Sequence, residues 1–84
     1  MAEIEVGVVS DFFAHPVVAG MELTGDLHVG DTVRVKGHTT DLEFRVDSLQ
    51  IDLQDVDAAH AGQSVGIKVP ERVRNGDRVY RVTP

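Results

Sequence analysis

Few residues in this sequence combine the types and spacing that catalysis or metal binding requires. The four histidines are His15, His28, His38 and His60. They show neither HxH nor HxxxH spacing, so the sequence does not indicate a zinc site. Hydroxyl, imidazole and carboxylate groups come together in HTTD, residues 38–41, but adjacent residues in a turn seldom form the geometry that activates a nucleophile. We therefore expect no enzymatic activity, no metal and no cofactor.

Three stretches share one glycine frame: LHVGDTVRV at 27–35, AHAGQSV at 59–65 and VRNGDRVYRV at 73–82. In each, two residues separate an apolar residue from Gly, and a polar residue and a strand-like run follow. A phosphate-binding loop would instead lead into a helix. Gly permits positive φ, and Asp can accept hydrogen bonds from nearby backbone donors. We therefore predict turns that begin strands.

Apolar and polar residues alternate along most of the chain, which predicts half-buried strands and an all-β fold. Ile4, Val6 and Val8 should share one face of the first strand. The expected strands cover residues 3–12, 17–23, 31–37, 41–53, 63–69 and 77–82. The core should bury Val6, Val8, Val33, Val35, Phe44, Val65, Ile67 and Val79 together.

Two local features interrupt this alternation. In DLEFRVDSLQIDL, residues 41–53, the apolar residues change phase after Val46, which predicts a β-bulge or bend at Asp47 and Ser48. Leu49, Ile51 and Leu53 should then face the core again. A helical turn is plausible only at 55–62, with Asp55 or Asp57 as its cap.

Composition is typical of one small cytoplasmic domain covering residues 1–84. The chain is 42% hydrophobic, has no cysteine and carries a net charge of −6. No apolar run approaches the roughly 18 residues of a membrane span, and the amino terminus has no basic leader before an apolar stretch. We expect no membrane partner. An acidic domain that binds RNA must gather its few cations on one face.

The first candidate for such a face is the strand expected at 31–37. With Val33 and Val35 inside, Arg34 and Lys36 point outward together with His38, and Arg45 should lie on the neighbouring strand. This surface could bind phosphates and stacked bases. Alternatively, Asp41 and Glu43 neutralise it as an ordinary solvated face.

A second candidate is the late cluster of Arg72, Arg74 and Arg78, which could instead pair with the carboxylates of DLQDVDAAH, residues 52–60. Phe12 and Phe13 are consecutive, so both cannot face inward from a regular strand. One of them should be partly exposed, either as a contact surface or as a cover for an open end of the core.

Much of the chain resembles the β-barrel second domain of translational GTPases such as elongation factor Tu. The matching stretches are VGVVSDFFAHPVVAGMELTGDLHVGDTVRVKG, SLQI, DAAHAGQSVGIKV and VRNGDRVYRV. Small stand-alone elongation-factor-like proteins are also similar, and similar barrels are appended to some collagenase-like peptidases. The resemblance implies a six-stranded, Greek-key antiparallel β-barrel. No GxxxxGK loop is present, so GTP hydrolysis and nucleotide binding are not implied.

Together these observations predict a non-catalytic binding module associated with translation or RNA. In one hypothesis, Arg34, Lys36, His38 and Arg45, or the late arginines, bind tRNA or ribosomal RNA. In the alternative, the domain docks on another protein, such as a translation-related one, through Phe12, Phe13 and Val18 without contacting nucleic acid.

Overall fold

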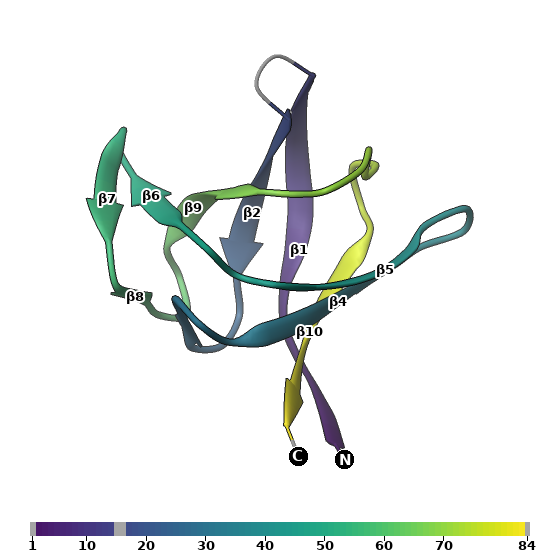
Figure 1. The fold of residues 1–84 in the computed structure, drawn as a ribbon, viewed down its shortest axis with the longest axis horizontal. Coiled ribbons are helices and arrows are strands. Elements are labelled where there is room, and N and C mark those ends of the chain that lie inside the picture. The colour runs from purple at the N-terminus through teal and green to yellow at the C-terminus, as the bar shows by residue number, and fades with distance from the viewer. Residues whose placement is uncertain (1, 15–16, 84) are drawn as a thin grey trace.

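The computed structural model describes residues 2–14 and 17–83. Over this part of the chain the structure is all-β, as predicted, with ten strands (Figure 1). In the same residues no helix is long and apolar enough to cross a membrane. The strands are β1 (Ala2–Ala14), β2 (Val17–Leu23), β3 (Leu27–His28), β4 (Thr32–Lys36), β5 (Asp41–Arg45), β6 (Leu49–Ile51), β7 (Gln54–Val56), β8 (Ala58–Ala59), β9 (Ser64–Lys68) and β10 (Arg78–Thr83).

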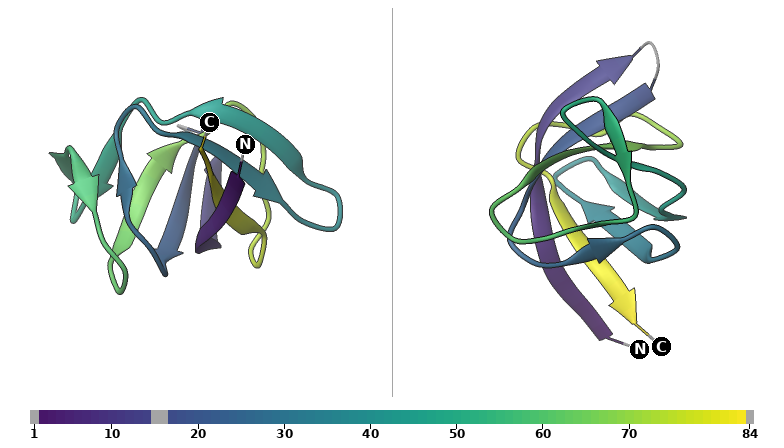
Figure 2. Two further views of the ribbon diagram at one scale, coloured as in Figure 1. Left: turned by 90° about the horizontal axis from the view of Figure 1, so that it is seen from below. Right: turned by 90° about the vertical axis from the view of Figure 1, so that its left-hand side faces the viewer.

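Eight strands form one antiparallel sheet in the order β5-β4-β10-β1-β2-β9-β6-β7, and β3 pairs with β8 separately. The large sheet curls around the core (Figure 2). Its edge strands β5 and β7 do not pair with each other in the described chain, so the predicted closed barrel of six strands is not observed. The long strand expected at 41–53 is divided into the two shorter strands β5 and β6.

Two β-bulges in β1 decide which of its residues face the core. The register shifts after Glu5 against β10 and after Val9 against β2. A bulge adds one residue and so reverses the side that the following residues face. Val6 and Val9 are therefore buried, whereas Val8 is half-buried and Ile4 is exposed. The prediction of one shared face for Ile4, Val6 and Val8 is wrong for this reason.

The bend predicted at Asp47 and Ser48 is confirmed, because strand structure is interrupted there and resumes at Leu49. Val46 and Leu49 are both buried on either side of the bend. Leu53, expected to face the core, is 91% exposed instead. It lies in the two-residue turn between β6 and β7, where the period of two no longer applies.

Residues 54–56 and 58–59 form the strands β7 and β8, so the predicted helical turn at 55–62 is wrong. Val56 pairs with Leu49, and Ala59 pairs with Leu27 in the small sheet. Ala59 is fully buried there. Tertiary pairing and burial outweigh the weak local preference of this stretch for a helix.

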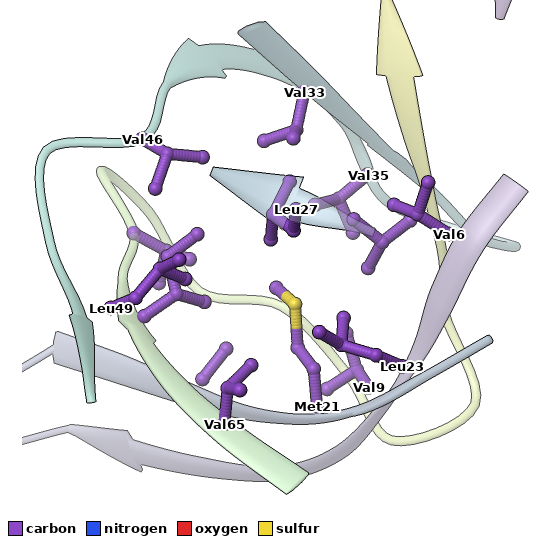
Figure 3. Close-up of a cluster of buried hydrophobic side chains, with 14 of the residues drawn as sticks. Val6, Val9, Met21, Leu23, Leu27, Val33, Val35, Val46, Leu49 and Val65 are labelled. Carbon is purple, nitrogen blue, oxygen red and sulfur yellow. The ribbon is translucent and has the colours of Figure 1, made fainter. Parts of the chain in front are cut away.

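Apolar side chains from both sheets form one core cluster, into which Met21 and Leu27 project (Figure 3). Six of the residues expected to be buried together are buried in it: Val6, Val33, Val35, Val65, Ile67 and Val79. Phe44 is partly buried against the same cluster.

The three glycine frames form the same turn, as predicted, and lead into β4, β9 and β10. In the first, the Asp31 Oδ2 accepts a hydrogen bond from the His28 backbone N–H at 2.9 Å. The Asp31 N–H in turn donates to the His28 carbonyl oxygen at 3.1 Å. The glycines have φ between 89° and 98°. The equivalent pairs are Gln63 with His60 and Asp77 with Arg74.

Candidate functional site

The outward face of β4 is basic in sequence but paired with carboxylates in the structure. The Lys36 Nζ lies 2.7 Å from Oε1 of Glu3, and the Arg34 Nη1 lies 3.2 Å from Oε2 of the same residue. Arg34 Nε is also within 3.5 Å of Asp41 and 3.8 Å of Glu43. The hydrogen bond from Lys36 lowers the pKa of Glu3. Arg34 and Lys36 are thus members of an ion-pair network at the surface.

The other predicted members of this face are less closely involved. Arg45 lies on β5 opposite Thr32, on the outward side with Arg34, and is exposed. His38 is exposed in the turn after β4. The Lys36 ammonium lies 5.3 Å from the Tyr80 ring centroid. A binding role for these side chains stays a prediction.

The late arginines do not form one patch. Arg72 lies over the Phe12 ring, 5.8 Å from its centroid, at a hollow of about 300 Å³ that Arg74 also lines. Arg78 is elsewhere, with its Nη1 2.8 Å from Oε1 of Glu5. Phe12 packs against the core while Phe13 is 56% exposed, which confirms that one of the two phenylalanines is exposed.

A larger groove of about 710 Å³ lies on the outer face of β1, β2 and β9, beside the β6–β7 turn. One row of register partners crosses its floor: Asp11, Gly20, Gly66 and Gln50. Because Gly20 and Gly66 face each other without side chains, the sheet is bare at the centre of the row.

Apolar side chains stand at both sides of this groove. Phe13 and Val18 are paired near the end of the β1–β2 hairpin, and Leu53 stands on the β6–β7 turn. Figure 1 shows these two hairpins on the same side of the molecule, away from the termini. Leu53 has φ of 66° and its neighbour Asp52 has φ of 52°. The turn therefore holds a large apolar side chain in water in a backbone conformation that leucine rarely adopts.

Among the residues that the structure describes, every charged one that lines the groove is acidic. These residues are Asp11, Glu22 and Asp52. Within the described residues no cation lies within 4.0 Å of their carboxylates, whereas Glu3 and Glu5 are paired. The groove was not predicted from the sequence. The available signals were Gly20 and Gly66, since glycine inside a strand often marks a close approach of another backbone.

The histidines also lie apart. Nδ1 of His60 lies 3.1 Å from Asp26, and that of His28 lies 3.7 Å from Asp31. In the described part of the chain, no three histidine, aspartate or glutamate side chains gather in a way that could hold a metal ion. His15 lies outside the described residues.

Comparisons with known proteins identify relatives for this domain. The chain matches no model of a known protein family. It is 46% identical over 79 residues to an uncharacterized protease of Methanocaldococcus jannaschii, covering 93% of this chain and 19% of the relative. It is 37% identical over 81 residues to a collagenase of Porphyromonas gingivalis, covering 94% of this chain and 20% of the relative. The chain thus spans about a fifth of the length of these relatives.

The fold is similar to that of a solved structure with little sequence identity. The C-terminal domain of a Geobacillus thermoleovorans protein described as a U32 peptidase matches with a TM-score of 0.88 at 19% identity. The match covers 96% of this chain and 93% of that domain. At this identity the likeness concerns the fold alone.

These relatives correct three predictions. The chain is similar to proteins named as a protease and collagenases, and not to a translation factor. The assignment as an elongation-factor-like, RNA-associated module is therefore wrong, and its suggested tRNA, ribosomal RNA and translation-protein partners lose their basis. The expectation of no enzymatic activity is also contradicted, because the relatives are named as a protease and collagenases. The strand and turn pattern is shared by unrelated functions, which explains the error.

Proposed function

We propose that this chain is the β-domain of a U32-type peptidase and that it captures polypeptide for cleavage. The observation that carries the proposal is the match to the Methanocaldococcus jannaschii protease over 93% of this chain. Because the match covers only 19% of that protease, most of the relative lies outside it and provides room for a separate peptidase unit.

The groove supports a role in holding polypeptide. Its bare floor at Gly20 and Gly66 would let an extended main chain approach the sheet closely. Phe13 and Leu53 would contact side chains of that segment from two sides. Capture of substrate outside the reacting centre supplies binding energy and raises the local concentration of the polypeptide, as linked binding sites do in general. The proposal includes a cytoplasmic location, because the chain has no cysteine and disulfides are rare in the cytosol.

A domain exchange tests this function. The matched segment of the Methanocaldococcus jannaschii protease is deleted in one variant and replaced by this chain in another. Cleavage is then measured with gelatin and with a short chromogenic peptide. We expect deletion to reduce gelatin cleavage more than cleavage of the short peptide, and replacement to restore it. Equal cleavage of gelatin by the intact and deleted proteases would contradict the proposal.

A further inference from the structure

We infer that the groove between Phe13 and Leu53 binds an extended polypeptide segment in which an apolar side chain is flanked by lysine or arginine. The inference rests on the proposed function for its setting, but the binding itself belongs to this chain. It depends on three independent features of the groove: its floor, its exposed leucine and its charge.

The floor fits an extended chain better than a globular surface. Gly20 and Gly66 are adjacent in register on neighbouring strands, and Gln50 continues the row on β6. A Cβ at Gly66 would meet only a Val18 methyl at 3.6 Å, an ordinary contact. Packing therefore does not require glycine at position 66. Because glycine has no side chain, the groove is open at this point.

The second feature is Leu53, whose backbone conformation and exposure are both unfavourable for a leucine. The two-residue turn between β6 and β7 has positive φ at both positions, which favours Asn-Gly or Asp-Gly. A leucine there is strained, and at 91% exposure it gains almost no burial in return. A ligand that covers this side chain together with Phe13 would supply the missing burial.

Charge selects the ligand. Asp11, Glu22 and Asp52 line the groove, and no lysine or arginine in the described parts of the chain does. Lys68 is the register partner of Val18 on β9, but it does not line the groove. Cations flanking an apolar anchor would therefore find carboxylates around the groove, whereas an acidic segment would be repelled. The Arg72 hollow is smaller, and the β4 face already has its charges paired.

Peptide titration of the labelled chain tests the inference. The probes are synthetic peptides of equal length, kept extended by interspersed proline, that combine leucine with lysine, leucine with glutamate, or serine with lysine. Binding is followed by amide NMR at low and at moderate salt. We expect the leucine and lysine peptide to bind most tightly, with shifts around residues 10–22, 50–53 and 64–66. Raising salt should weaken it moderately, because the apolar contact persists.

Variants separate the groove from the fold. Gly66→Val places a side chain on the floor of the groove. Leu53→Gly removes the exposed leucine side chain and gives the turn a residue that it favours. Each should weaken binding about fivefold or more, as loss of an interface anchor does. Thr32→Val is the matched control for Gly66→Val, since it places valine on the outward side of β4 away from the groove. It should leave binding unchanged.

A double variant that removes two carboxylates of the groove, together with a control, tests the role of charge. Glu22→Gln with Asp52→Asn should weaken the lysine peptide about two- to threefold, as exposed ion pairs suggest. Glu71→Gln, which removes an exposed carboxylate outside the groove, should have no effect.

Several outcomes would overturn the inference. These are absence of binding by all peptides, equal binding of the leucine peptides with lysine and with glutamate, or shifts outside the groove. Groove shifts that appear on concentrating the chain without peptide would point to a second copy as the occupant and also overturn it. Gelatin cleavage that depends on the domain, without peptide binding, would reject this inference alone. Peptide binding without any effect on gelatin cleavage would reject the proposed function alone.

Discussion

Asp77 links two turns that lie 40 residues apart in sequence. Its carboxylate is buried, with the residue 5% exposed, and Oδ2 accepts a hydrogen bond from the Arg74 N–H at 2.9 Å. A Cβ at Gly37 would overlap this carboxylate. Gly37 is therefore required by close packing, although its φ lies outside the positive range.

Gly37→Ala should lower the free energy of unfolding by about 1–3 kcal/mol, the usual cost of overpacking. Urea denaturation provides the measurement. Gly66→Ala is the matched control, because its new Cβ makes only an ordinary contact. That control should be neutral or slightly stabilising. Equal losses in both variants would show that glycine flexibility, and not the Asp77 contact, matters.

Glu3 provides a second prediction for a single residue. The Lys36 hydrogen bond holds its pKa below the ordinary value of 4.5. A carboxyl whose pKa is lower in the folded protein stabilises the fold above its unfolded pKa, and this contribution is lost as pH falls through the folded pKa. Lys36→Met should therefore raise the pKa of Glu3, measured by NMR of its side-chain carbon. An unchanged pKa would contradict the ion pair.

Among the secondary-structure elements, the three glycine turns share hydrogen bonds but differ in burial. Asp77 is buried, Asp31 is half-buried and Gln63 is exposed. Each side chain accepts a hydrogen bond from a backbone N–H three residues earlier. The cost of losing the acceptor should follow burial, because water can replace it only where the turn is exposed.

Asp77→Ala should accordingly cost about 1–3 kcal/mol, and Gln63→Ala about 0.5–1 kcal/mol, in free energy of unfolding. Equilibrium denaturation of the single variants gives both values. The double variant Gly37→Ala with Asp77→Ala should be less destabilised than the sum of the two changes, because the overlap is gone. Strict additivity would contradict the contact.

In the β6–β7 hairpin we expect a substitution to stabilise the fold. Leu53→Gly should raise the free energy of unfolding by about 0.5–1 kcal/mol, since it relieves left-handed strain at an exposed position. Thermal denaturation measures the change. Gln54→Gly, in the adjacent strand, should destabilise instead. Loss of stability in Leu53→Gly would mean that the leucine side chain supports the fold.

For the whole molecule, the first and last strands are hydrogen-bonded neighbours. β1 pairs with β10 from Ala2 opposite Thr83 onward, so the two ends lie side by side (Figure 1). This pairing closes almost the entire chain into one loop. Non-local pairing of this kind slows folding, because loop entropy is lost before the contacts form.

Refolding should therefore take milliseconds to seconds, roughly as in other small β-domains. Stopped-flow dilution from urea can follow Tyr80, which is the single tyrosine in a chain without tryptophan. A refolding time of microseconds would contradict a mechanism limited by this pairing. A Val79→Ala variant, which removes a fully buried side chain from β10, should slow refolding if β10 is docked in the transition state.

Local sequence patterns determined much of the architecture. Strict alternation is found in β4 and β9, where Val33 and Val35 or Val65 and Ile67 are buried. The glycine frames were recognisable because a tight turn with positive φ and an adjacent side-chain acceptor uses a few consecutive residues. The bend after Val46 was visible because a change of phase must reverse the facing side. These are interactions among neighbours in sequence.

Tertiary structure alone decided the surface. Glu3 reaches Lys36 across β10, and Phe13 and Leu53 face one groove from different hairpins. Such contacts depend on strand order and on the bulges in β1, which no local pattern specifies. The sequence by itself therefore determined most of the longer strands, the three glycine turns and most of the core, but not the short strands β3, β7 and β8. The pairing of charges and the groove arose only when distant segments packed, because charge and shape at a surface depend on which strands become neighbours.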